Sequence, residues 1–144
     1  MKKIKLLALG VVLGVIIVAV AALFVPQYPF ADIGCSDIEQ ILIYPPFYTT
    51  PYTVPEEAAP ELVAALNEVV IYRYRQYRAW EDLTGVQYPM ITLQTTDGES
   101  IWISACNPVF IIDGKGYHTE YDSCNTVRVV WSKISKSLTI QRAN

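Results

Sequence analysis

The chain has few of the side chains from which reactive centres are built. Its 144 residues include a single histidine, His118, and three cysteines, with no Cys-x-x-Cys pair. One histidine leaves no convincing set of zinc ligands, and there is no glycine-rich loop of the kind that binds phosphate. The sequence therefore predicts no catalytic residue, no metal site and no cofactor.

Basic residues are also scarce beyond the first few positions. Residues 26–144 contain all 14 acidic residues but eight of the 11 basic ones, because the other three are Lys2, Lys3 and Lys5. The resulting net charge of −6 argues against a nucleic-acid partner, which needs a basic surface. Ten tyrosines and three tryptophans argue against a disordered chain.

The longest apolar run extends from Leu6 to Val25 (LLALGVVLGVIIVAVAALFV). As a helix it is about 30 Å long, which matches the hydrocarbon thickness of a bilayer. The lysines before it favour a cytoplasmic N-terminus. We therefore expect a basic cytoplasmic segment at 1–5, a single transmembrane helix acting as a signal anchor at 6–25, and the C-terminal domain outside the cell membrane.

A cleaved signal peptide is the alternative for this segment. Ala19-Val20-Ala21 has the small-x-small pattern of a cleavage site, so that residues 1–21 would be removed and the protein secreted. The apolar run continues beyond this site and exceeds the usual length of a signal-peptide core, which favours the uncleaved anchor. Gly10 and Gly14 share one helix face, a spacing that permits self-association of membrane helices.

The remaining chain predicts an α+β domain at 35–144, after a proline-containing spacer at 26–34 in which Tyr28 and Phe30 are expected near the headgroups. Two Asp-Gly pairs, Asp97-Gly98 and Asp113-Gly114, each lie between β-like runs and indicate hairpins. We expect a mainly antiparallel sheet of about five to six strands with one or two packed helices. The predicted strands cover 37–44, 72–75, 88–95, 100–106, 109–112 and 116–121, and the predicted helices cover 60–70 and 123–134.

Two of these assignments have competing alternatives. Residues 70–78 could instead extend the preceding helix to Trp80, because the tyrosine–arginine alternation slips at Gln76. Residues 123–134 have strand-like composition, although one helix face would contain Val127, Val130, Trp131 and Ile134.

The chain combines one membrane helix with a helix ending near Leu66-Asn67, a Met90-Ile91-Thr92-Leu93 strand before Asp97-Gly98, and an Ile111–Tyr117 hairpin. This arrangement is similar to that of small membrane-anchored cell-surface proteins of unknown function in Gram-positive bacteria. The resemblance covers most of the predicted external domain. It rests on turns and strand starts, so it implies location and fold and assigns no reactive residue.

The strongest candidate for a binding surface is a segment rich in tyrosine and arginine, the residue types enriched where proteins bind partners. Its members are Tyr72, Arg73, Tyr74, Arg75, Tyr77 and Arg78. The alternative is structural: the tyrosines would pack under a helix and the arginines would pair with acids on neighbouring strands. The Pro45–Tyr52 loop (PPFYTTPY) is a second candidate, which could equally pack over the sheet.

The cysteines allow one enzymatic alternative. Cys124 at a helix start could have a lowered pKa, His118 could act as its base, and Asp122 could orient the imidazole. Cys124 could equally pair with Cys106 in a disulfide, or all three cysteines, Cys35 included, could be reduced. From the sequence we expect a non-catalytic, membrane-tethered binding or accessory domain, with another envelope protein as a possible class of partner.

Overall fold

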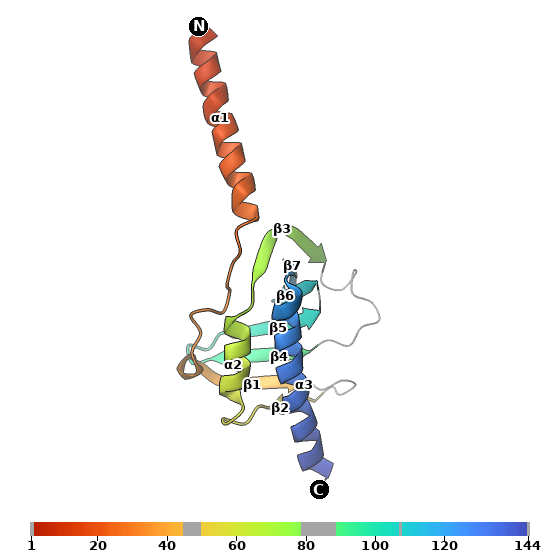
Figure 1. The fold of residues 1–144 in the computed structure, drawn as a ribbon. Helices are drawn as coiled ribbons and strands as arrows, with labels where there is room; N and C mark the ends of the chain where they lie inside the picture. The colour runs from red at the N-terminus through yellow and green to blue at the C-terminus, as the bar shows by residue number, and fades with distance from the viewer. Residues whose placement is uncertain (1, 45–49, 79–88, 107, 144) are drawn as a thin grey trace.

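The computed structural model describes residues 2–44, 50–78, 89–106 and 108–143. Side chains are described from Leu9 onward in the first helix and up to Leu138 in the last helix. The side chain of Arg78 is not described. The chain forms an α+β domain below one projecting helix (Figure 1). The strands of the sheet all pair antiparallel, which confirms the α+β class and the antiparallel sheet of the prediction.

The first helix, α1 (Lys2–Leu23), extends away from the domain (Figure 1). Its described apolar side chains are exposed, including Leu9, Leu13 and Ile17. Among the described residues, no helix is both long enough and apolar enough to cross a membrane.

The sheet has seven strands, rather than the five to six predicted. In spatial order they are β2 (Tyr52–Thr53), β1 (Ile38–Tyr44), β4 (Met90–Thr95), β5 (Ser100–Cys106), β6 (Val109–Ile112), β7 (Lys115–Thr119) and β3 (Ile71–Arg78). The extra strand is β2, which pairs with β1 through Thr53 opposite Leu42 and Tyr52 opposite Ile43. The three prolines of the surrounding segment argued against a strand at this position.

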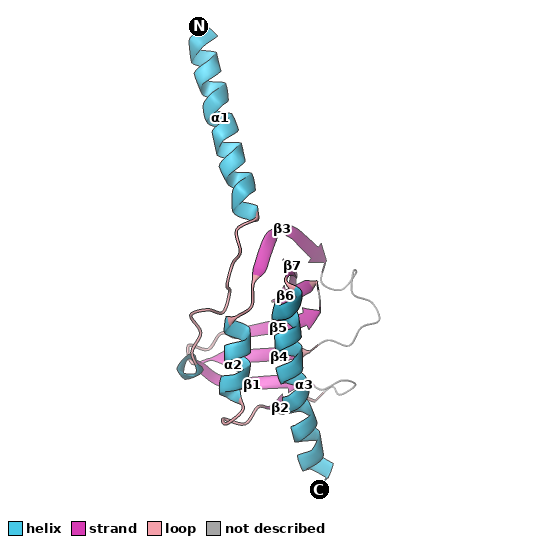
Figure 2. Ribbon diagram, in the orientation of Figure 1, coloured by secondary structure: helices cyan, strands magenta, loops and turns pink. Residues whose placement is uncertain are grey.

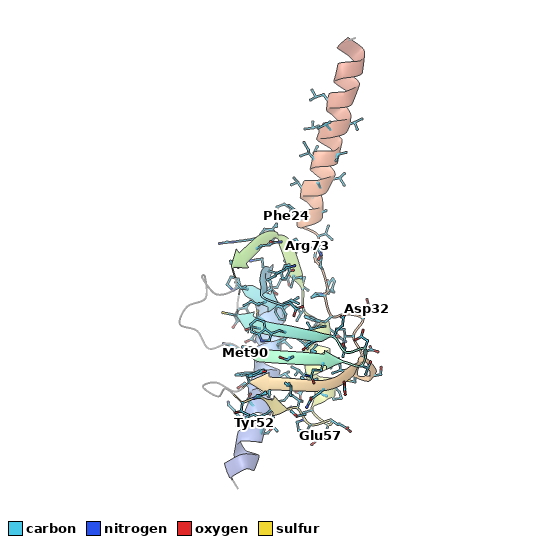
Figure 3. All side chains as sticks on the ribbon, turned by 180° about the vertical axis from the view of Figure 1, so that it is seen from behind. Phe24, Asp32, Tyr52, Glu57, Arg73 and Met90 are labelled. Atoms are coloured by element: carbon cyan, nitrogen blue, oxygen red, sulfur yellow. The ribbon has the colours of Figure 1, made fainter. Side chains whose placement is uncertain are left out.

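Two helices cover one face of this sheet (Figure 2). They are α2 (Ala59–Asn67) and α3 (Tyr121–Ala143), which contact each other. Helix α3 also contacts β1 and β5, and both helices contribute to the same hydrophobic core as the sheet. A short 3₁₀ turn, η1 (Cys35–Asp37), precedes β1. We call the sheet face under α2 and α3 the inner face and the opposite one, turned to the viewer in Figure 3, the outer face.

Alternation along the strands places the main core on the inner face. In β1, Ile41 and Ile43 are buried while Leu42 is half-buried, as period-two patterning predicts. The same alternation buries Ile91 and Leu93 in β4. Helix α2 contributes buried Leu62, Val63, Ala65 and Leu66.

Both open assignments resolve in favour of the first interpretation. Residues 71–78 form strand β3, and residues 121–143 form helix α3. The face of α3 that was predicted to be apolar is buried against the sheet: Val127, Val130, Trp131 and Ile134 are between 0% and 8% exposed. Helical periodicity therefore outweighed the strand-like composition of this segment.

The Asp113-Gly114 hairpin has the expected backbone. Asp113 and Gly114 have φ values of 49° and 78°, and Gly98 in the other hairpin has 89°. Two consecutive positive φ values are those of the tight turn that matches the twist of two antiparallel strands.

The segment at 26–34 is part of the domain rather than a free spacer. Phe30 was expected near headgroups, yet it is 2% exposed and its ring lies 6.0 Å from that of Phe110 in the main core. Tyr28, in contrast, is 55% exposed. The hydrophobic effect favours burial of the more apolar ring, that of Phe30. The alternation of prolines and aromatic residues in PQYPF did not show which of the two rings would be buried.

Candidate functional site

The tyrosine–arginine segment forms an edge strand that is interrupted by a large bulge. In the ladder between β3 and β7, Tyr72 pairs with His118 and Gln76 pairs with Tyr117. Because His118 and Tyr117 are neighbours, the three residues between Tyr72 and Gln76 have no counterpart on β7. We call Arg73, Tyr74 and Arg75 the Tyr–Arg bulge, and all three are exposed.

Several hydrogen bonds fix the start of β3, just before the bulge. The backbone groups of Ile71 and Gln27 bond to each other in both directions, each at 2.9 Å. The Val70 N–H donates to Ser123 Oγ at 3.2 Å, and Thr119 Oγ1 donates to the Val70 carbonyl at 2.6 Å. The bulge therefore projects from a strand whose position is set by the 26–34 segment, by β7 and by α3.

The tyrosines of β3 gather around His118 on the outer face. The ring centroids of Tyr74, Tyr72 and Tyr77 lie 5.1, 6.2 and 6.5 Å from that of His118. The Tyr77 hydroxyl is 3.3 Å from His118 Nδ1. The Tyr72 hydroxyl donates to Glu120 Oε1 at 2.5 Å, and this hydrogen bond raises the pKa of Tyr72.

The arginines of the bulge have no acidic partner among the residues that the structure describes. The guanidinium carbon of Arg75 lies 4.9 Å from the centroid of the Tyr77 ring, a cation–π geometry. Within the part of the chain that the structure describes, neither Arg73 nor Arg75 forms an ion pair, whereas Lys133 of α3 pairs with Glu61 at 2.7 Å. The ion pairs that the structural alternative expects are therefore not found for Arg73 and Arg75, while the side chain of Arg78 is not described.

The bulge is also in contact with the end of α1. The Phe24 and Tyr74 rings are stacked, with centroids 5.1 Å apart and an interplanar angle of 11°. Figure 3 shows Phe24 and Arg73 close together at the end of the domain where α1 leaves it. The sequence placed the tyrosines and arginines on one strand, as the structure does, but it did not reveal Phe24 and His118 as their neighbours, because neither contact is local in sequence.

A glycine on β7 makes room for one of these tyrosines. A Cβ built on Gly116 would lie 2.9 Å from both Cβ and the backbone oxygen of Tyr77. Tyr77 continues across the outer face into a small cluster with Trp102, Val109 and Ile111. The absence of a side chain at 116 therefore lets the Tyr77 backbone lie close to β7.

The predicted thiol site is not assembled in the structure. Cys124 is 3% exposed, its Sγ lies 3.6 Å from the Val109 carbonyl oxygen, and burial raises its pKa to about 12. The lowered pKa expected at a helix start is thus wrong, because desolvation of the thiolate outweighs the helix end. His118 lies among the tyrosines of the outer face, and Asp122 is exposed.

None of the three cysteines forms a disulfide. Cys35 is exposed, Cys106 is half-buried and Cys124 is buried, so the disulfide between Cys106 and Cys124 is not formed. Among the residues that the structure describes, no group of three His, Cys, Asp or Glu side chains could hold a metal ion.

Two hollows lie away from β3. One of about 540 Å³ is bordered by β1, β2 and α2, with Cys35, Glu39 and Glu56 in its wall. A shallower one of about 850 Å³ follows α3 and has Arg128, Lys133 and Lys136 on its rim. The other predicted recognition loop, Pro45–Tyr52, falls largely outside the described residues; at its end Tyr52 is buried in β2.

Comparisons of the chain with known protein families, with curated proteins and with solved structures gave no match.

Proposed function

We propose that the protein is a membrane-tethered, non-catalytic binding or accessory domain on the outer side of the cell membrane, and that its contact surface is the Tyr–Arg bulge. The single observation that carries this proposal is the contact between Phe24 and Tyr74. This contact connects the Tyr–Arg bulge with the end of α1, the helix that projects away from the domain.

The apolar surface of α1 supports the tether. Leu9, Val12, Ile16 and Val20 are 49% to 66% exposed although the domain below has an ample core. A continuous apolar surface of this kind marks contact with a membrane or a partner. In the sequence the run begins at Leu6, before the first described side chain, and spans about 30 Å as a helix.

The charges at the N-terminus support the orientation. Three lysines precede the apolar run, whereas the domain after it carries the acidic excess, so the N-terminus is cytoplasmic and the domain external. The resemblance to Gram-positive cell-surface proteins agrees with this location. The four-residue spacing of Gly10 and Gly14, which puts both on one face of α1, supports self-association through that face.

The tether is tested on the full chain in cells. We expect the protein to stay in the membrane pellet after alkaline carbonate extraction and to have the mass of the uncleaved chain. A soluble product beginning at Ala22 would contradict the anchor and show that residues 1–21 are a discarded signal.

The contact surface is tested by cross-linking from a photoreactive residue at Gln76, which is exposed beside the bulge. Arg73→Glu with Arg75→Glu should remove the cross-links, because it reverses the charge of the surface. Arg128→Glu with Lys136→Glu on α3 makes the same charge change elsewhere and should leave them in place. Equal cross-linking in both double variants would contradict the assignment of the surface.

A further inference from the structure

The position of the bulge relative to α1 defines what it can touch. Phe24 lies just beyond the last residue of α1 and stacks on Tyr74, and Gln27 then pairs with Ile71 at the base of β3. Only a few residues separate the apolar helix from this edge strand. If α1 spans the membrane, as proposed above, the Tyr–Arg bulge lies at the surface of that same bilayer.

We propose that the bulge, with Phe24 and Tyr28, is a docking surface for the phospholipid headgroups of the membrane that α1 spans. The domain then lies with its β3 edge against the bilayer. This inference rests on the proposed tether and names the partner of the proposed contact surface.

The side chains of the bulge have the chemistry that headgroups select. Tyrosine is enriched at the level of the headgroups, where its ring meets the apolar boundary and its hydroxyl meets water. Arginine binds phosphate through two parallel hydrogen bonds. Arg73 and Arg75 are exposed and form no ion pair among the described residues, so both guanidinium groups remain able to bind phosphate.

The charge distribution of the domain favours this orientation. Several acidic residues lie toward the opposite edge of the sheet or in the β4–β5 turn, namely Glu39, Glu56, Glu57, Asp97 and Glu99. Figure 3 shows Glu57 near β2, at the end of the domain far from Phe24. An anionic membrane attracts the bulge and repels the acidic edge, although Glu120 near β3 opposes part of the attraction.

Proximity favours lipid over a soluble or protein ligand. A surface fixed beside the end of a membrane helix meets headgroups at a high effective concentration without a separate encounter. The bulge is also small, three exposed residues and two flanking rings, which suits headgroup contact better than the area of a stable protein interface. Each arginine near an anionic surface contributes about a fivefold preference, and two contribute about 25-fold.

The experiment uses the full chain in nanodiscs of phosphatidylcholine, alone or mixed with phosphatidylglycerol. A nitroxide is placed at Gln76→Cys beside the bulge or at Thr53→Cys on the distal edge, with Cys35→Ser and Cys106→Ser in both. The measured quantity is the collision rate of the nitroxide with a water-soluble nickel complex. In the mixed discs we expect a several-fold lower rate at position 76 than at position 53.

The variants identify the cause of any protection. Arg73→Gln with Arg75→Gln should restore the rate at position 76, as should high salt, which screens the attraction. Arg128→Gln with Lys136→Gln removes the same charge from α3 and should not change the rate. Circular dichroism verifies that both double variants are folded.

The contrary outcomes separate the two proposals. Equal rates at positions 76 and 53 in both lipid mixtures, with the protein still inserted, would overturn headgroup docking and leave the tether intact. Failure of the protein to remain with the discs on flotation would overturn the tether and the docking together. A rate at position 76 that falls only when a second protein is added would replace the lipid with a protein partner.

Discussion

Gly116 is the residue on which the close approach of β3 to β7 depends. Replacing it with alanine places a Cβ 2.9 Å from the Tyr77 backbone oxygen and 3.1 Å from Val109 Cγ1. These neighbours are a strand backbone and a buried side chain, so relief requires the strands to separate. We expect a loss of about 1 to 3 kcal/mol in the free energy of unfolding, measured by urea titration in detergent.

Gly34→Ala provides the matched control. The nearest atom to its added Cβ is a carboxylate oxygen of Asp37 at 3.3 Å. This oxygen accepts a hydrogen bond from the Gly34 N–H, but it lies at the end of an exposed side chain rather than in a strand backbone. Its urea midpoint should move much less than that of Gly116→Ala. Equal shifts would show that close packing at 116 is not the cause.

Cys124 should be resistant to alkylation in the folded protein. Burial raises the pKa of its thiol from 9.0 to about 12, so the thiolate is stabilised less in the folded chain than in the unfolded one. Stability from the neutral thiol is thus fully present below about pH 9 and is lost as the pH rises toward 12. With iodoacetamide at pH 8, mass spectrometry should find rapid modification of exposed Cys35 and modification of Cys124 only in urea.

The control for this prediction is Cys124→Ala. This variant should show a weaker fall in stability between pH 9 and 11 than the unsubstituted protein. Rapid labelling of Cys124 in the native state would contradict its buried, neutral assignment and would revive the thiol site that the sequence allowed as an alternative.

At the scale of elements, the junction between α1 and the sheet depends on one aromatic stack. The Phe24 and Tyr74 rings are close to parallel, and stacked pairs of this type contribute about 0.5 to 1.5 kcal/mol. Phe24→Ala should therefore raise the rate of amide exchange at Gln27 and Ile71 by about 2- to 10-fold, through easier opening of their paired hydrogen bonds. Hydrogen-exchange mass spectrometry measures this directly.

Val25→Ala is the comparison variant, because Val25 is exposed next to Phe24 and has a similarly apolar side chain. It should leave exchange at these amides unchanged. If the double variant Phe24→Ala with Tyr74→Ala showed the sum of two independent effects, the two rings would not be coupled.

The elements differ in how far the sequence could predict them. The Asp113-Gly114 hairpin and the apolar face of α3 depend on local signals, a turn dipeptide and a 3.6-residue period, and both were confirmed. Strand β2 is two residues long beside prolines and has no period of its own to detect. Its pairing with β1 depends on tertiary contacts rather than on a local sequence signal.

The candidate site shows the same division. The alternation of Tyr72 to Arg75 predicted a strand, and its slip at Gln76 marks the end of the bulge. The size of the bulge follows from the register with β7, and the stacking of Tyr74 follows from the path of the 26–34 segment. Both are long-range contacts that a single sequence does not encode as a pattern.

At the scale of the whole molecule, the exposed thiol of Cys35 lies in the domain that follows α1, so its labelling would show on which side of a membrane the domain lies. Cys35 begins η1, within the domain and after the segment that follows α1. The only basic residues before the apolar run, Lys2, Lys3 and Lys5, lie at the other end of α1. The two ends of this helix therefore carry different reactive groups, one for each side of the membrane that α1 is proposed to span.

We expect a membrane-impermeant maleimide to label Cys35 in intact cells, because the proposed orientation places the domain outside and this thiol is exposed. Cys35→Ser should abolish most of that labelling, since Cys124 is buried. An impermeant amine reagent should reach the N-terminal lysines only after lysis, as peptide mass spectrometry would show. Labelling of Cys35 only after lysis would place the domain in the cytoplasm and leave the acidic edge and the Tyr–Arg bulge on the opposite side of the membrane from the one proposed.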